Sequence, residues 1–153
     1  FQRAPVDLYA LSESVIERLE PVAARQSVAL HLTGEHAEIL GVEQLLKEMI
    51  YNLLDNAIKY NVPNGSATLS IHKSGEHVIL TVSDTGIGIP DEAKNRVFER
   101  FYRVDKGRAR KNGGTGLGLA IVKHIVQLYG GRVTLSSTVG KGSVFTITLP
   151  LAE

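Results

Sequence analysis

Four polar side chains recur along one segment of the chain, "EMIYNLLDNAIKYN" (48–61): Glu48, Asn52, Asn56 and Lys59. Their spacing of four, four and three residues aligns them on one side of an α-helix. Asparagine is a poor helix former, so its recurrence at i and i+4 indicates that the amides have a use. Carboxamide oxygens suit Mg²⁺, and a lysine can meet a phosphate as a point charge. The row is a candidate metal and phosphate site; the alternative is an ordinary exposed polar face.

A second candidate is "DTGIGIP" (84–90), in which Asp84 ends a strand-like run and Gly86 and Gly88 follow in a loop. A carboxylate there can accept a hydrogen bond from an exocyclic amine, and glycines let a planar base lie against the backbone. A Rossmann fingerprint does not fit, because the third glycine is missing and Pro90 stands where the phosphate-facing helix would begin. The alternative is a plain turn.

The third candidate, "GGTGLGLAIVKHIV" (113–126), places four glycines directly before a stretch with helical apolar spacing. The first N–H groups of a helix are unpaired and its dipole favours negative charge, so this segment can cradle phosphates. A mobile surface loop is the alternative. The Walker pattern is absent, since "GKGS" (140–143) lacks the upstream glycine, and this segment is interpreted as a hairpin turn.

Periodicity predicts the elements that carry these segments. Helices are expected at 7–26, with Asp7 as N-cap and a kink or shifted end at Pro21, at 42–60, at 91–101 and at 117–129. Strands are expected at 28–32, 37–40, 67–72 and 77–83, and as a pair within 132–150. Residues 102–112 are polar, basic and aperiodic, and they are a candidate flexible loop. This order predicts an α/β fold: a two-layer α/β sandwich whose mixed, mostly antiparallel sheet is packed on one side by about three helices.

Composition limits the classes of function. The 153 residues suit one domain, 1–153, and 17 Lys and Arg nearly balance 16 Asp and Glu, which gives no bulk attraction for nucleic acid or acidic lipid. The absence of cysteine excludes disulfides and favours an intracellular compartment. No apolar run suits a membrane span, and "FQRAPVDLYA" does not resemble a signal peptide. We expect a fragment cut from a longer chain.

Together these segments resemble, over nearly the whole chain, the ATP-binding catalytic domain of sensor histidine kinases, with the Bergerat-type fold that DNA gyrase and mismatch-repair ATPases share. "EMIYNLLDNAIKYN" resembles the N box, "DTGIGIP" the first glycine box, "RVFERFYRVD" the F box, "GGTGLGLAI" the second glycine box and "GKGSVFTITLP" the closing strand pair. The similarity is greatest to kinases of the phosphate-response and cell-wall-response kind.

The resemblance implies roles for individual residues. Asn56 would hold Mg²⁺, Asn52 would support metal and phosphates, Lys59 would meet phosphate and Asp84 would bind the adenine amino group. The implied catalytic set is Glu48, Asn52, Asn56 and Lys59. The implied ATP-binding set is Asn52, Asn56, Lys59, Tyr60, Asp84, Gly86, Ile87, Gly88, Ile89, Phe98, Tyr102, Arg103, Gly114, Thr115, Gly116, Leu117, Gly118 and Leu119. Residues 103–112 match the ATP lid, and core packing is expected to account for at least one of Phe98 and Phe101.

The implied activity is transfer of the γ-phosphoryl group of Mg·ATP to a histidine on a separate dimerisation domain, for relay to a response regulator. None of the histidines His31, His36, His72, His77 and His124 has the "HELRTP"-like context of the acceptor, so all are expected to be structural or exposed. The resemblance also implies a monomeric, cytoplasmic domain of a kinase anchored in a bacterial membrane, without direct contact to membrane or nucleic acid.

Three other functions stay open. In related ATPases a glutamate near Glu48 orients a water, which would make the chain an ATP-hydrolysing switch. An anti-sigma-factor-like serine kinase uses this fold alone. A module that senses nucleotide without catalysis is the third. The F box and the second glycine box favour the histidine kinase.

Overall fold

The computed structural model describes residues 2–102 and 116–151. One sheet has five strands in the order β2-β4-β5-β7-β6. Its strands are β2 (Ala29–Gly34), β4 (Ser66–Ser74), β5 (His77–Asp84), β7 (Gly142–Pro150) and β6 (Arg132–Thr138). Only β2 and β4 pair in parallel; the other pairs are antiparallel. A separate antiparallel pair joins β1 (Ala4–Asp7) to β3 (Glu38–Gly41).

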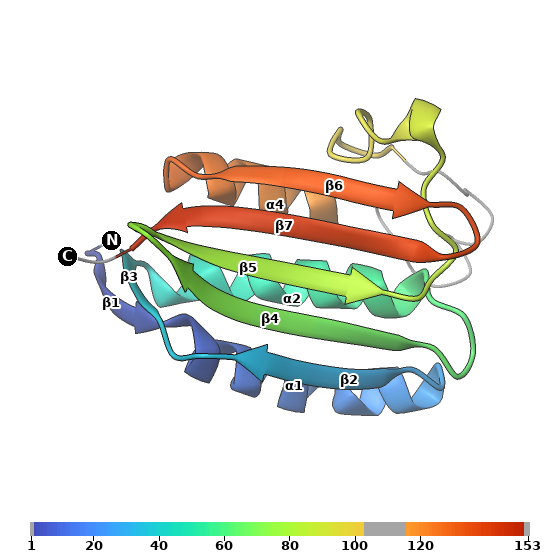
Figure 1. The fold of residues 1–153 in the computed structure, drawn as a ribbon, viewed down its shortest axis with the longest axis horizontal. Coiled ribbons are helices and arrows are strands. Elements are labelled where there is room, and N and C mark those ends of the chain that lie inside the picture. Colours follow the sequence, from blue (N-terminus) through green and yellow to red (C-terminus); the bar gives the residue numbers. More distant parts are fainter. Residues whose placement is uncertain (1, 103–115, 152–153) are drawn as a thin grey trace.

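Helices α1 (Leu8–Arg25), α2 (Glu43–Lys59) and α4 (Gly118–Leu128) all lie on one face of the large sheet (Figure 1). The sheet places alternate side chains toward them, such as Leu69, Val82 and Phe145, which are at most 1% exposed. Serines and threonines alternate with these residues on the opposite face, for example in the row Ser70, Thr81 and Thr146. The predicted two-layer sandwich with a mixed, mostly antiparallel sheet is therefore confirmed.

Helix α2 carries the predicted apolar stripe, and its buried residues are Leu46, Met49, Ile50, Leu53, Leu54, Ala57 and Ile58. Helix α1 begins at the predicted cap, where Asp7 Oδ1 accepts from the N–H groups of Tyr9 and Ala10. Burial tends to raise the pKa of Asp7, but the hydrogen bonds from His36 and from those two N–H groups outweigh it and hold the pKa below its ordinary value. The helix continues through Pro21 to Arg25.

Two elements differ from the sequence-based prediction. Strand β1 was not predicted; it is four residues long and pairs with β3. The α-helix predicted over 91–101 was wrong, because only Asp91–Ala93 form a 3₁₀ turn and irregular turns follow. Its backbone bonds join residues three apart, and the ion pairs Asp91–Lys94 and Glu99–Arg96 have the same spacing. The i,i+3 pairs fit the 3₁₀ geometry, in which these side chains are eclipsed.

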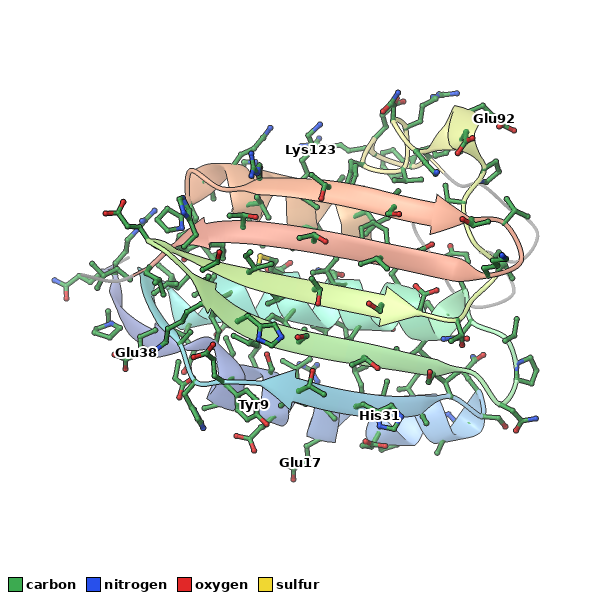
Figure 2. All side chains as sticks on the ribbon, viewed as in Figure 1. Tyr9, Glu17, His31, Glu38, Glu92 and Lys123 are labelled. Atoms are coloured by element: carbon green, nitrogen blue, oxygen red, sulfur yellow. The ribbon has the colours of Figure 1, made fainter. Side chains whose placement is uncertain are left out.

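All five histidines are exposed, as predicted. His36 is paired with Asp7, at 2.6 Å between Nδ1 and Oδ2. Figure 2 shows His31 at strand β2, on the opposite edge of the sheet from Glu92 and Lys123. Within residues 2–102 and 116–151, no three His, Cys, Asp or Glu side chains are grouped as a metal site, and no helix is both long and apolar enough to cross a bilayer.

Candidate functional site

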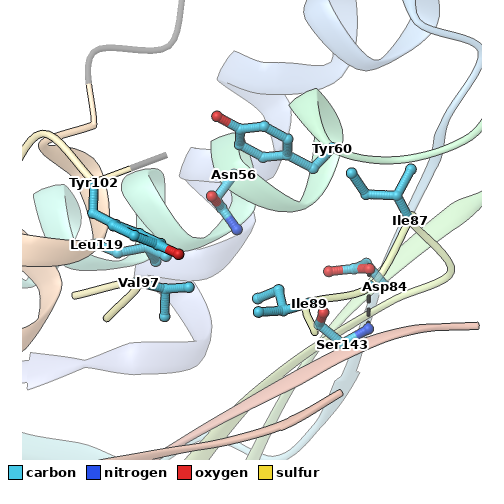
Figure 3. Close-up of a pocket in the computed structure, with 10 residues that line it drawn as sticks. Asn56, Tyr60, Asp84, Ile87, Ile89, Val97, Tyr102, Leu119 and Ser143 are labelled. Carbon is cyan, nitrogen blue, oxygen red and sulfur yellow. Dashed lines mark hydrogen bonds between the residues drawn. The ribbon is translucent and has the colours of Figure 1, made fainter. Parts of the chain in front are cut away.

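A cavity of about 560 Å³ opens where the carboxyl end of α2 meets the segment that follows β5. The residues around it are Asn56, Tyr60, Asp84, Ile87, Gly88, Ile89, Val97, Tyr102, Leu119 and Ser143. Figure 3 shows Asn56 and Tyr60 across the space from Asp84, Ile89 and Ser143. Because most of this lining is apolar, we call it the apolar cavity.

A second cavity, of about 740 Å³, shares Asn56, Tyr60, Val97, Tyr102 and Leu119 with the first. Its other lining residues are Asn52, Asp55, Lys59, Gly116, Leu117, Gly118 and Ile121. We call it the polar cavity. Because the two cavities share lining residues, they lie side by side, an arrangement that suits one ligand with an apolar and a charged end.

Asp84 is the one carboxylate that the described residues contribute to the lining of the apolar cavity. Its Oδ1 accepts from the N–H groups of Gly86 (2.8 Å) and Ser143 (3.2 Å), which lies opposite it on β7. Among the described residues, none donates a hydrogen bond to Oδ2. Burial raises the pKa of the Asp84 carboxyl above its ordinary value, although the two N–H groups lower it in part. A half-buried acceptor thus faces the cavity.

The first glycine segment lies close to neighbouring backbone. A Cβ on Gly86 would lie 2.3 Å from the carbonyl oxygen of Tyr60, and one on Gly88 would lie 2.3 Å from that of Thr138. Gly88 also has a φ of +77°. The N–H of Ile87 donates to the Tyr60 oxygen at 3.0 Å. These contacts require glycine, and they attach the segment to the end of α2 at Tyr60 and to the end of β6 at Thr138.

The polar row of α2 is only partly gathered at the site. Asn52 and Lys59 line the polar cavity, and Asn56 lines both cavities. The Asn52 amide donates to the Glu48 carbonyl at 2.9 Å, and Lys59 forms an ion pair with Asp55 at 2.9 Å. Glu48 is exposed and does not line either cavity. The four residues of the predicted row all lie on α2, and three of them, Asn52, Asn56 and Lys59, line a cavity.

The second glycine segment begins α4 beside Asn52. Gly116 has a φ of +78°, and its carbonyl accepts from the N–H of Phe101 at 2.7 Å. Gly118 is the first residue of α4, and a Cβ there would lie 3.3 Å from Asn52 Oδ1. The amino end of an α-helix therefore opens toward the polar cavity, with Leu117 and Leu119 in its lining.

The aromatic residues of the predicted F box separate. Phe98 packs edge-on against Phe145 of the core, with ring centroids 6.0 Å apart. Phe101 is 69% exposed, and Tyr102 lines both cavities. The expectation that core packing accounts for one phenylalanine is confirmed for Phe98. Arg103, Gly114, Thr115 and the predicted lid at 103–112 lie outside the described residues.

Sequence reasoning missed several residues at the site, among them Asp55 and Ile121 in the lining of the polar cavity. Val97 and Ser143 line the apolar cavity. Asn61 is 4% exposed and its amide bonds to the carbonyls of Ala57 and Ser66, which links the end of α2 to β4. The signal for Ser143 was available, because "GKGS" was interpreted as a hairpin turn and a serine after such a turn pairs across the sheet.

Comparison with known proteins gives this arrangement a family. Residues 41–153 match the family described as histidine kinase-, DNA gyrase B- and HSP90-like ATPase. The chain is 45% identical to the circadian input-output histidine kinase CikA of Synechococcus elongatus, covering 97% of this chain and 20% of the relative. It is 38% identical to the sensor histidine kinase WalK of Bacillus subtilis, covering 100% and 26%. The chain therefore spans about a quarter of these relatives' length.

Solved structures agree with the sequence relatives. The mycobacterial sensor histidine kinase MprB superposes with a TM-score of 0.86 at 29% identity, covering 98% of both chains. The full-length ShkA structure in complex with AMPPNP gives a TM-score of 0.84 at 31% identity, over 98% of this chain and 31% of that chain. The boxes predicted from the sequence, the sandwich and the family match agree: the chain belongs to the histidine kinase-, DNA gyrase B- and HSP90-like ATPases, and its relatives are sensor histidine kinases.

Proposed function

We propose that the chain binds Mg·ATP and donates the γ-phosphoryl group to a histidine on a separate acceptor domain of the same protein, for relay to a response regulator. The observation that carries this proposal is the position of Asp84. Its Oδ1 is held by two backbone N–H groups, and its Oδ2 faces an apolar cavity. An acceptor in that setting selects a ligand with a buried donor, such as the amino group of adenine.

The remaining lining of the apolar cavity supports a purine. Ile87, Ile89 and Tyr60 supply apolar and aromatic surface, and Gly86 and Gly88 keep the backbone bare beside Asp84. A guanine base would place a carbonyl where adenine has its amino group, against the carboxylate oxygen. We infer from this that ATP and ADP bind in preference to GTP and GDP.

The polar cavity supports the phosphates and the metal. Asn52 and Asn56 offer neutral amide oxygens, which are hard ligands that suit Mg²⁺ together with phosphate oxygens. Lys59 offers a cation, and the first turn of α4 offers backbone N–H groups that have no acceptor within their own helix. Bound Mg²⁺ would neutralise the charge of the transferring group. Asn56 would hold the metal, and Asn52, Lys59 and the Gly116–Leu119 segment would fix the phosphates.

The acceptor histidine is proposed to come from elsewhere, because none of the five exposed histidines lines either cavity. Catalysis would consist of positioning and charge neutralisation, as phosphoryl transfer requires. Glu48 is the residue that an ATP-hydrolysing switch would need. Its exposed position outside both cavities favours the kinase over that alternative.

Two measurements test the proposal. Calorimetry with ADP and GDP, each with and without Mg²⁺, should give Mg²⁺-dependent binding of ADP and at least about tenfold weaker binding of GDP, the loss expected when a buried acceptor meets a carbonyl. Incubation with γ-labelled ATP should leave the chain itself unlabelled and should label a histidine of the acceptor domain added in trans. The rate of labelling should rise with concentration, since the two parts are untethered.

Clear results would overturn it. Equal affinity for GDP and ADP would remove Asp84 from base recognition. Acid-labile label on any of the chain's own histidines would place the acceptor inside this chain. Steady release of inorganic phosphate that is abolished by Glu48→Ala would favour the ATP-hydrolysing switch.

A further inference from the structure

Ser137 is a buried hydroxyl at the edge of the site that lines neither cavity. It lies on β6, is 9% exposed and forms three hydrogen bonds. Its Oγ accepts from the N–H of Ile89 at 2.8 Å, donates to the carbonyl of Gly142 at 3.0 Å and lies 2.7 Å from Ser143 Oγ. Polar side chains are buried only where partners satisfy them, so this set of bonds specifies a serine here.

The first glycine segment rests on the β6–β7 hairpin through few contacts. The N–H of Gly140 donates to the Ile87 carbonyl at 2.9 Å, and Gly88 lies against the Thr138 carbonyl. Both of these contacts involve backbone alone. Among the hydrogen bonds that the described residues form between segment 86–90 and the hairpin, the one from the Ile89 N–H to Ser137 Oγ uses a side chain of the hairpin. A single substitution can therefore release Ile89, which lines the apolar cavity.

The same hydroxyl bears on where the Ser143 proton points. Ser137 has one proton, and both the Gly142 carbonyl and the Ser143 oxygen lie within hydrogen-bond distance of it. When the Gly142 carbonyl receives this proton, Ser143 donates in the bond between the two hydroxyls. The Ser143 oxygen then has lone pairs available toward the cavity, which Ser143 lines together with Asp84. In this arrangement the Asp84–Ser143 side of the cavity presents acceptors and no Ser143 proton.

We infer that Ser137 is a positioning residue for base recognition, which holds Ile89 and orients the Ser143 hydroxyl so that the cavity accepts an amino group and rejects a carbonyl. This inference rests on the proposed nucleotide site. The two hydroxyls lie opposite each other in the β6–β7 register, so the effect passes through one cross-strand pair. Ser137 itself would not touch the base.

The test compares Ser137→Ala with the parent chain and with Ser136→Ala, an exposed serine on the same strand. Calorimetry uses three probes with Mg²⁺: ADP, inosine diphosphate, which has a carbonyl in place of the amino group, and tripolyphosphate, which has no base. In Ser137→Ala the Ser143 proton is free to donate into the cavity. We expect ADP affinity to fall about tenfold, the ADP-to-IDP preference to fall by about as much or more, and tripolyphosphate affinity to stay unchanged.

A second measurement needs no ligand. Hydrogen exchange at the Ile89 amide should speed up by about tenfold or more in Ser137→Ala, while the Gly86 amide, held by Asp84, should keep its protection. Ser137→Thr keeps the hydroxyl and should restore both the Ile89 protection and the preference for ADP. Ser136→Ala should behave as the parent chain.

The outcomes separate the inference from the proposed function. If the parent chain binds no ADP, the proposed function fails, and the exchange at Ile89 still tests the hold by Ser137. If it binds ADP but Ser137→Ala keeps the parent preference over IDP, the inference is wrong and the function stands. If Ser137→Ala lost affinity for ADP and for tripolyphosphate alike, the inference would also be wrong, because such a loss would indicate that the whole site had loosened.

Discussion

The two glycine-rich segments that meet at the cavities are constrained in different ways. In the first, a Cβ on Gly86 or Gly88 would lie 2.3 Å from a backbone carbonyl oxygen. In the second, the nearest described atom of another element to a Cβ on Gly118 would be the side-chain amide oxygen of Asn52, at 3.3 Å. Gly116 belongs to the second segment but has a positive φ, and a Cβ placed on it would lie 2.7 Å from the Cα atom of Phe101.

This difference indicates what each glycine is for. The glycines of the first segment are required by the fold, because backbone that cannot move occupies the space of any side chain. The neighbour of Gly118 is Asn52 on α2, and the side-chain amide of Asn52 can rotate away. The fold should therefore tolerate a side chain at position 118. Its glycine is better explained by the close approach of a ligand to the amino end of α4. The apolar cavity is thus fixed by the protein itself, and the polar cavity is shaped for what it binds.

The largest effect is expected for Gly88→Ala. Alanine at a φ of +77° is strained, and its Cβ would overlap the Thr138 carbonyl. We expect a loss of at least about 2 kcal/mol of unfolding free energy and no detectable ADP binding. Urea unfolding and calorimetry measure the two. If this variant were as stable as the parent chain, the fold would not require glycine in the first segment.

Asp84→Asn is expected to separate binding from stability. The folded-state pKa of Asp84 is raised by burial, so its contribution to stability is present below the ordinary pKa and is lost as the pH rises through the folded-state value. The ionised carboxylate therefore costs stability at pH 7. Asparagine keeps an oxygen for Gly86 and Ser143 but has no charge, so the variant should be as stable as the parent or more stable at pH 7.

Calorimetry should show that Asp84→Asn loses ADP affinity by about 30-fold or more, the loss expected for a charge-assisted hydrogen bond. The exposed Asp91→Asn, which removes the ion pair with Lys94, is the control and should bind ADP normally. The stability difference between Asp84→Asn and the parent should shrink toward low pH. A variant that is less stable at pH 7 would contradict the burial argument.

The sequence alone predicts the helices that carry the site better than the cross-strand residue pairs, such as Ser137 and Ser143, that lie beside it. The spacing of Asn52 and Asn56 and the apolar stripe of α2 are local patterns, and both predict their structure correctly. Ser137 and Ser143 meet only because β6 and β7 pair in one register, which no local pattern gives. The helix predicted at 91–101 failed because i,i+3 bonds replaced the longer α-helical ones.

Asn56→Ala removes the amide of a residue that lines both cavities. Alanine is the better helix former, so the free energy of unfolding should change by less than about 1 kcal/mol. ADP binding without Mg²⁺ should persist, whereas the gain in affinity on adding Mg²⁺ should disappear. Phosphotransfer in trans should fall by about 100-fold, the size of losing one preorganised electrostatic group.

The exposed Asn95→Ala is the matched control for Asn56→Ala and should keep both the Mg²⁺ effect and the rate of transfer. A Mg²⁺ response that survives in Asn56→Ala would remove this residue from the metal. The metal would then have to be held by Asn52 and the phosphates without it.

The smallest effect on folding is expected for Gly118→Ala, and it tests the comparison most directly. Gly118 starts α4, where alanine is favoured over glycine by up to about 1 kcal/mol, and the 3.3 Å contact is with a side-chain amide that can rotate. The unfolding midpoint should therefore stay within a few degrees of the parent, unlike that of Gly88→Ala. If the glycine serves the ligand, ATP affinity should fall several-fold because the new methyl group faces the polar cavity, whereas affinity for adenosine, which has no phosphate, should not change. Unchanged ATP affinity would mean that the bare backbone at Gly118 has no part in binding, and marked unfolding would mean that both glycine segments are constrained alike.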